Sequence, residues 1–183
     1  TLGYRGYENP SFLSTPGAKD VGIEFYTFSK TFNMAGWRLA FAAGNDQMIE
    51  ALNLIQDHLF VGIFPALQEA GIAALLDPKS EEAVAQLNAT YDSRRDAFVQ
   101  AAAKIGWQAF PSRGSFYAWM PVPEGYTSES FADLLLEKAH VAVAPGKGFG
   151  PAGDAYVRIG LLVEPERLVE AVNRIANLHL FNN

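Results

Sequence analysis

The sequence has 183 residues, of which 14 are basic and 20 acidic, none is cysteine, and 49% are hydrophobic. This composition excludes a disordered chain and a disulfide scaffold, and a net charge of −6 gives no basis for nucleic-acid binding through a cationic surface. The longest uncharged stretch, near residues 59–68, is too short to span a bilayer. Residue 1 is Thr and no signal-peptide pattern follows it, so we expect a cytoplasmic protein that is a fragment of a longer chain.

The N-terminal segment predicts a loop followed by two strands. Residues 1–19 are rich in Gly, Pro, Ser and Tyr without any periodic pattern, which favours an irregular loop. Residues 21–28 form a nearly continuous apolar run, which is typical of a strand buried on both faces in a parallel sheet. A second strand is expected over residues 39–43, ending at Gly44.

Three helices are predicted after these strands. Asn45 or Asp46 can cap the first helix, and Pro65 suits the first turn of the second. Ser80, followed by two glutamates, can begin the third. We expect these helices over residues 46–59, 65–76 and 80–105.

The rest of the chain predicts short alternating strands and two helices. The strands are expected over residues 107–110, 115–122, 141–144 and 156–162, and the helices over residues 128–139 and 165–178. This order indicates a small α+β unit. We therefore predict two domains, 1–90 and 91–183, with the boundary in the long helix.

Two cations stand out between the predicted strands. Lys30 and Arg38 are the only charged side chains between Phe25 and Asn45, and both are positive. A lysine after a buried strand must be solvated, paired or covalently modified, and desolvation lowers the pKa of its amine. A neutral amine attacks carbonyls, while Arg38 with the hydroxyl of Thr27 or Ser29 could hold a phosphate. The alternative for Lys30 is a solvated lysine at a strand end.

The segment around Lys30 resembles the pyridoxal-phosphate attachment motif of class I/II aminotransferases. Residues 27–38 read TFSKTFNMAGWR, which fits the pattern [ST]-x-S-K followed by G-x-R, with Ala40 where the family usually has glycine. By this resemblance Lys30 forms the Schiff base with the cofactor and acts as the catalytic base. Thr27 and Arg38 would bind the cofactor phosphate, with Ser29 as a further candidate.

A second resemblance to the same family lies downstream. Residues 141–146, 149–150 and 156–160 resemble the segment in which an arginine binds the substrate α-carboxylate, and residues 114–117 match another strand of that small domain. Arg158 would be the carboxylate ligand, since a guanidinium suits a bidentate carboxylate. The alternative from the residues alone is a structural ion pair with a glutamate such as Glu164.

The resemblance implies a fold-type I enzyme of α/β and α+β class. Residues 1–90 would be the C-terminal part of the large pyridoxal-phosphate domain, and residues 91–183 the small α+β domain. The implied reaction transfers an amino group between an α-amino acid and a 2-oxo acid, in a homodimer. Family members carry further cofactor contacts upstream of the lysine that this chain lacks, so we expect poor activity from the chain alone.

Two other functions remain open, and two further patterns are set aside. The lysine motif and Arg158 also serve carbon–sulfur β-lyases of this fold, and a non-catalytic fragment is the third reading. Residues 148–153 fit G-x-G-x-x-G but lead into a strand rather than a helix, which excludes a dinucleotide site. The histidines are scattered, so no metal is expected: His58, His140 and His179.

Overall fold

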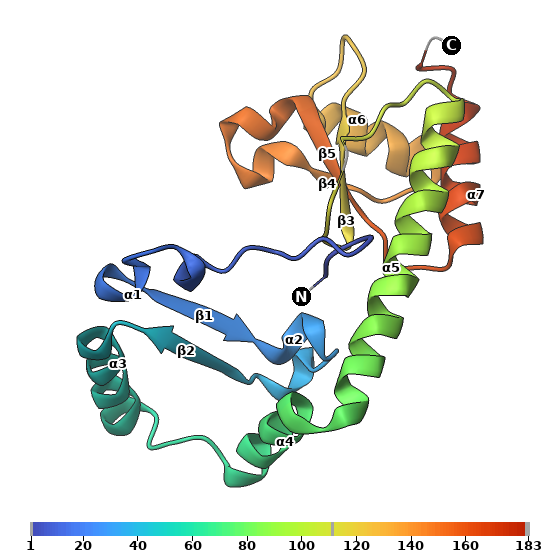
Figure 1. Cartoon of the computed structure of the whole chain (residues 1–183). Coiled ribbons are helices and arrows are strands. Elements are labelled where there is room, and N and C mark those ends of the chain that lie inside the picture. Colours follow the sequence, from blue (N-terminus) through green and yellow to red (C-terminus); the bar gives the residue numbers. More distant parts are fainter. Residues whose placement is uncertain (1, 111, 182–183) are drawn as a thin grey trace. The chain divides into compact units, whose positions relative to one another are not determined.

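The computed structural model describes residues 2–110 and 112–181 and divides into two compact units (Figure 1). The first unit comprises Thr1–Asn88 and the second Ala89–Asn183. Within the described residues, no helix combines the length and the apolar character needed to cross a membrane.

The first unit is built on an antiparallel pair of strands, β1 (Ile23–Thr27) and β2 (Ala40–Gly44). The register runs from Ile23 opposite Gly44 to Thr27 opposite Ala40. The expectation of a parallel sheet is therefore wrong for this pair. A continuous apolar run indicates burial but not the direction of the neighbouring strand. The link over residues 28–39 holds only α2 (Phe28–Thr31) and a 3₁₀ turn, too little for a parallel crossover.

The helices of the first unit follow the local signals of the sequence. Helix α3 (Asp46–Leu59) is capped by Asn45, whose side-chain oxygen accepts a hydrogen bond from the backbone N–H of Met48 at 3.1 Å. Helix α4 (Pro65–Leu76) begins at its proline. Both predictions are confirmed. The expected N-terminal loop is interrupted by a 3₁₀ turn (Phe12–Ser14) and by α1 (Ala18–Val21).

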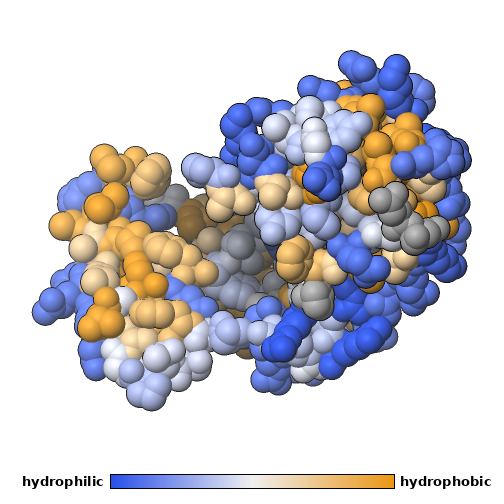
Figure 2. All heavy atoms as spheres, turned by 90° about the horizontal axis from the view of Figure 1, so that it is seen from above, coloured by the Kyte–Doolittle hydropathy of each residue, from blue (hydrophilic) through white to orange (hydrophobic). Residues whose placement is uncertain are grey.

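Much of the apolar surface of the first unit is uncovered within this chain. Phe25 on β1 is 66% exposed, so the expected burial of this strand on both faces is not found. A groove of about 770 Å³ lies between β2, α3 and α4. Hydrophobic side chains gather on the surface of this part of the molecule, at the left of Figure 2. Other exposed members of this set are Phe41, Leu54, Ile55, Leu59, Phe60, Val61, Phe64, Ile72 and Leu76.

The long helix α5 (Pro78–Lys104) begins two residues before the predicted start at Ser80. Its first residues belong to the first unit and the rest to the second. A proline is tolerated at the first position of a helix because its missing N–H would have no partner there.

The second unit holds a three-stranded antiparallel sheet of order β3-β5-β4. Its strands are β3 (Tyr117–Pro121), β4 (Ala144–Pro145) and β5 (Tyr156–Gly160). Helix α6 (Ser128–Leu134) continues into a π-helical turn (Leu135–Ala139), and α7 (Pro165–Ala176) follows β5. Both helices agree with the prediction.

The strand predicted over residues 107–110 is not formed. Trp107 is 1% exposed and donates its indole N–H to the carbonyl of Pro121 at 2.8 Å. Its ring packs edge-on against Phe98 and Phe131 in the hydrophobic core of this unit. The apolar residues read as a strand thus serve as a core anchor beside the sheet, which an alternating pattern cannot distinguish from a short strand.

Candidate functional site

Thr27 and Ser29 present their hydroxyls together where β1 passes into α2. The Thr27 hydroxyl accepts a hydrogen bond from the backbone N–H of Ser29 at 3.2 Å, and it lies 2.9 Å from the Ser29 hydroxyl, to which it donates. The side chain of Thr27 therefore caps the helix that carries Lys30. This local geometry follows from the preference of threonine for the position just before a helix.

Arg38 lies at the same end of the β1–β2 pair as Thr27. The carbonyl of the next residue, Leu39, accepts a hydrogen bond from the backbone N–H of Phe28 at 3.2 Å. Arg38 itself has a left-handed backbone with φ of 53°, and its Nη1 donates to the carbonyl of Ala35 at 3.0 Å. The fold thus brings the Thr27, Ser29, Lys30 and Arg38 positions together at the end of one hairpin.

Lys30 is exposed on α2, whereas its neighbours Phe28 and Thr31 are buried. Of the three states that the sequence left open for Lys30, solvated, paired or covalently modified, exposure to solvent is the one found in this chain. The reason is the open face of β1, which leaves the strand end in contact with solvent. Neither the groove beside β2 nor the smaller one between α4 and α5 is lined by Lys30 or Arg38.

The charge of this site is positive. Residues 25–45 contain no acidic side chain, and the preceding carboxylate, Glu24, is engaged by the N-terminal loop. Hydrogen bonds from the Ser11 hydroxyl and from the backbone N–H of Leu13 lower the pKa of Glu24. Glu24 therefore stays ionised while interacting with residues outside the Lys30–Arg38 segment.

These donors fit the pyridoxal phosphate that the sequence resemblance implies. A phosphate monoester needs cations and hydroxyl or N–H donors, which Arg38, Thr27 and Ser29 supply at one end of the hairpin. An aldehyde needs a primary amine beside that phosphate, and Lys30 follows Ser29 directly. All four side chains are exposed or half-buried and thus reachable by a ligand.

Arg158, on β5 of the second unit, contacts two aromatic rings. The centre of its guanidinium lies 4.1 Å from the ring centroid of Tyr117 and 4.2 Å from that of Phe149. Across residues 2–110 and 112–181, no hydrogen bond or ion pair engages its side chain. The alternative partner Glu164 instead pairs with Arg94 at 2.6 Å. The alternative of an Arg158–Glu164 ion pair is therefore wrong.

Tyr117 and Phe149 were not singled out individually by sequence reasoning. The sequence alone held no signal for either residue. Tyr117 lies beside Arg158 because of the register of β3 and β5, in which Trp119 is opposite Arg158 and Tyr117 is two residues away on the same face. Phe149 comes from the turn after β4. The part of the chain that the structure describes contains no cluster of three or more His, Asp or Glu side chains suited to a metal ion.

Comparison with known proteins gives a consistent family. The profile described as aminotransferase class I and II matches residues 6–175. The L-glutamine–4-(methylsulfanyl)-2-oxobutanoate aminotransferase of Bacillus subtilis is 59% identical over 98% of this chain and 45% of that protein. An LL-diaminopimelate aminotransferase of Moorella thermoacetica is 48% identical over 94% of this chain and 44% of that protein.

Solved structures agree with these sequence matches. Substrate-bound BacF from Bacillus subtilis aligns with a TM-score of 0.90 and 45% identity, over 98% of this chain and 46% of that one. An aminotransferase from Staphylococcus aureus aligns with a TM-score of 0.91 and 39% identity, over 99% of this chain and 48% of that one. The chain thus spans somewhat under half the length of these relatives. Class I/II aminotransferases use pyridoxal phosphate, and this chain belongs to the class I and II aminotransferase family.

Proposed function

We propose that this chain is the C-terminal part of a fold-type I aminotransferase that moves an amino group between an α-amino acid and a 2-oxo acid. The observation that carries the proposal is the grouping of Thr27, Ser29, Lys30 and Arg38 at one end of the β1–β2 pair. Membership of the aminotransferase family and the names of the relatives support the same reaction class.

In this proposal Lys30 is the catalytic residue. Pyridoxal phosphate, when bound, supplies an aldehyde and an electron-accepting ring. The Nζ of Lys30 would be the nucleophile for that aldehyde and, when free, the base that takes the proton from the substrate Cα. The Thr27 and Ser29 hydroxyls and the Arg38 guanidinium would hold the phosphate and so keep the cofactor beside Lys30.

Arg158 is proposed to bind the α-carboxylate of the substrate. Its cationic side chain has no ionic partner among the described residues and contacts the rings of Tyr117 and Phe149. A carboxylate is common to α-amino acids and 2-oxo acids, so one guanidinium can serve both half-reactions.

We further propose the domain assignment and the need for additional chain. Residues 1–90 would belong to the large cofactor domain and residues 91–183 to the small domain. The exposed apolar surface of the first unit would be covered by the segments that make up the remaining length of the relatives. The complete enzyme would be a cytoplasmic homodimer, which sedimentation and cell fractionation can test.

The test is an amino-transfer assay on the complete polypeptide that contains this chain. A nitrogen label supplied on the amino donor should appear on the 2-oxo acid acceptor. Lys30→Ala should lower this rate by about 10²- to 10⁴-fold, the range that general acid–base catalysis contributes. Lys19→Ala, which removes an exposed lysine from α1, should leave the rate near that of the unchanged enzyme.

Other products would replace the proposal with one of its alternatives. Pyruvate and ammonia formed without an acceptor would identify a carbon–sulfur β-lyase. An intact polypeptide that neither transfers the label nor eliminates ammonia, and that binds no pyridoxal phosphate, would identify a non-catalytic module.

A further inference from the structure

We propose that Tyr117 and Phe149 are positioning residues that set the plane of the Arg158 guanidinium and so determine how firmly the enzyme holds a substrate carboxylate. This inference rests on the proposed carboxylate role of Arg158 and adds two residues to which that proposal gives no role.

The two rings approach Arg158 from separate elements. Tyr117 begins β3, next to β5, and Phe149 ends the 3₁₀ turn Gly146–Phe149 after β4. Their centroids lie 4.1 and 4.2 Å from the guanidinium carbon, well within the range of cation–π contacts. Two rings at nearly equal distance restrict the rotation of the long arginine side chain.

Ring contacts leave the hydrogen-bonding capacity of an arginine intact. The N–H donors of a guanidinium lie in its plane, whereas aromatic rings attract its faces. An ion pair would instead occupy the donors, and the nearby glutamate that could do so, Glu164, is bound to Arg94. Arg158 is therefore oriented while its fork of donors stays available to a planar carboxylate.

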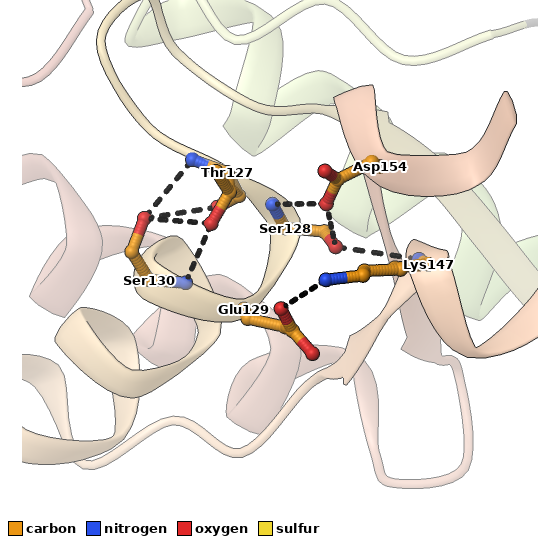
Figure 3. A network of polar contacts seen from close by, with 6 residues as sticks. All are labelled: Thr127, Ser128, Glu129, Ser130, Lys147 and Asp154. Carbon is orange, nitrogen blue, oxygen red and sulfur yellow. Dashed lines mark hydrogen bonds and ion pairs between the residues drawn. The ribbon is translucent and has the colours of Figure 1, made fainter. Parts of the chain in front are cut away.

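The loop that carries Phe149 is itself anchored, as Figure 3 shows. The Asp154 carboxylate accepts hydrogen bonds from the hydroxyl of Ser128 at 2.8 Å and from its backbone N–H at 3.2 Å, and Ser128 is fully buried. The Nζ of Lys147 lies 2.7 Å from the carboxylate of Glu129 on α6. Lys147 and Asp154, which lie on either side of Phe149 in the sequence, are thus both bonded to the start of α6.

The close packing of two glycines adds to this anchoring. A Cβ on Gly146 would lie 2.2 Å from the carbonyl oxygen of Gly153, and one on Gly153 would lie 2.1 Å from that of Gly146. The backbones at both ends of the loop are therefore in direct contact. Phe149 is 53% exposed and its ring packs edge-on against Trp119, so its position depends on this backbone and on that ring contact rather than on full burial.

The first experiment measures the orientation of Arg158 in the complete polypeptide by NMR. Protons above an aromatic ring resonate upfield, so the side-chain N–H and CH₂ signals of Arg158 should be shifted upfield. Phe149→Leu and Tyr117→Leu should each reduce this shift, whereas Tyr117→Phe, which keeps the ring, should retain it. Phe110→Leu is the matched control, because Phe110 is also 53% exposed but packs against Tyr156.

The second experiment measures amino transfer by the complete enzyme. Loss of either ring should raise the KM for the amino donor about two- to fivefold, which corresponds to one exposed cation–π contact, with little change in kcat. Tyr117→Phe, which keeps the ring, should leave the KM near that of the unchanged enzyme. Phe110→Leu should change neither constant.

The two experiments separate failure of this inference from failure of the proposed function. If Arg158→Lys raises the KM strongly but Phe149→Leu and Tyr117→Leu do not, the carboxylate role stands and the positioning role is overturned. If Arg158→Lys leaves the KM unchanged, the carboxylate role itself fails. If the Arg158 signals lie at ordinary positions in the unchanged chain, the ring contacts are absent and the inference is wrong.

Discussion

Arg38 combines a positive charge with a planar set of donors, and one substitution separates the two. Arg38→Lys keeps the charge but loses the fork of N–H groups and the bond to the carbonyl of Ala35. Loss of one hydrogen bond to a charged group costs about 1.5 kcal/mol or more, so pyridoxal phosphate should bind the complete enzyme about tenfold more weakly. Equilibrium titration of the apoenzyme measures this.

The control for charge and length is Arg167→Lys, on the exposed face of α7. The Arg167→Lys enzyme should bind pyridoxal phosphate with the same affinity as the unchanged enzyme. Equal affinity of the Arg38→Lys enzyme would show that Arg38 acts only as a point charge or lies outside the phosphate site.

Thr27 caps the start of α2 and is also a candidate phosphate ligand. Its effect on stability can be measured separately from its effect on cofactor binding. Thr27→Val removes the hydroxyl that caps α2 and should destabilise the chain by about 0.5–2 kcal/mol. Thr27→Ser keeps a capping oxygen and should lose much less. Urea unfolding of the 183-residue chain measures the free energies, and equal stabilities for the Val and Ser variants would contradict the capping role.

At the scale of residues, the sequence proposed the members of the candidate site but not their surroundings. Lys30, Arg38, Thr27 and Ser29 could be proposed because residues 27–38 resemble a known attachment motif, and their roles stay predictions. The exposure of Lys30 could not, because it depends on what covers β1. The rings around Arg158 could not be assigned either, since Phe149 reaches Arg158 only through the tertiary fold.

At the scale of elements, local signals located the helices. Asn45 and Pro65 act within one turn of the residues they stabilise, so the starts of α3 and α4 agree with the prediction. The direction of β2 relative to β1 and the absence of a strand over residues 107–110 depend on partners distant in the chain. Apolar patterns report burial, and they do not report which neighbour provides it.

The bond network at the start of α6 predicts a specific response to acid. Hydrogen bonds from Ser128 lower the pKa of Asp154 below its ordinary value of 3.8. A lowered pKa in the folded state means that ionised Asp154 stabilises the fold above 3.8, and that this contribution is lost as the pH falls through the lowered pKa. Asp154→Asn should therefore reduce stability at neutral pH, and the difference from the unchanged chain should shrink in acid.

Urea unfolding at about pH 7 and about pH 2.5, followed by tryptophan fluorescence, measures this difference. Asp133→Asn, which alters an exposed carboxylate on the same helix, is the control. A stability difference for Asp154→Asn that is the same at both pH values would show that its charge does not anchor the loop.

At the scale of the whole molecule, the uncovered apolar surface of the first unit predicts self-association of the isolated chain. Exposed groups such as Phe25 and Leu59 favour contact with any apolar surface, including another copy. Leu59→Lys should lower the weight-average molar mass that sedimentation measures at a given concentration. Val163→Lys, on an exposed site of the second unit, should not. A monomeric unchanged chain would contradict this expectation.

The central claim is that Lys30 binds the aldehyde of pyridoxal phosphate, and trapping that bond tests it most directly. The complete enzyme is mixed with pyridoxal phosphate, reduced with borohydride and digested, and the peptides are identified by mass spectrometry. The account predicts a stable pyridoxyl adduct on the peptide that contains Lys30, and its loss in Lys30→Ala but not in Lys19→Ala. An adduct distributed over other lysines, with Lys30 unmodified, would contradict it.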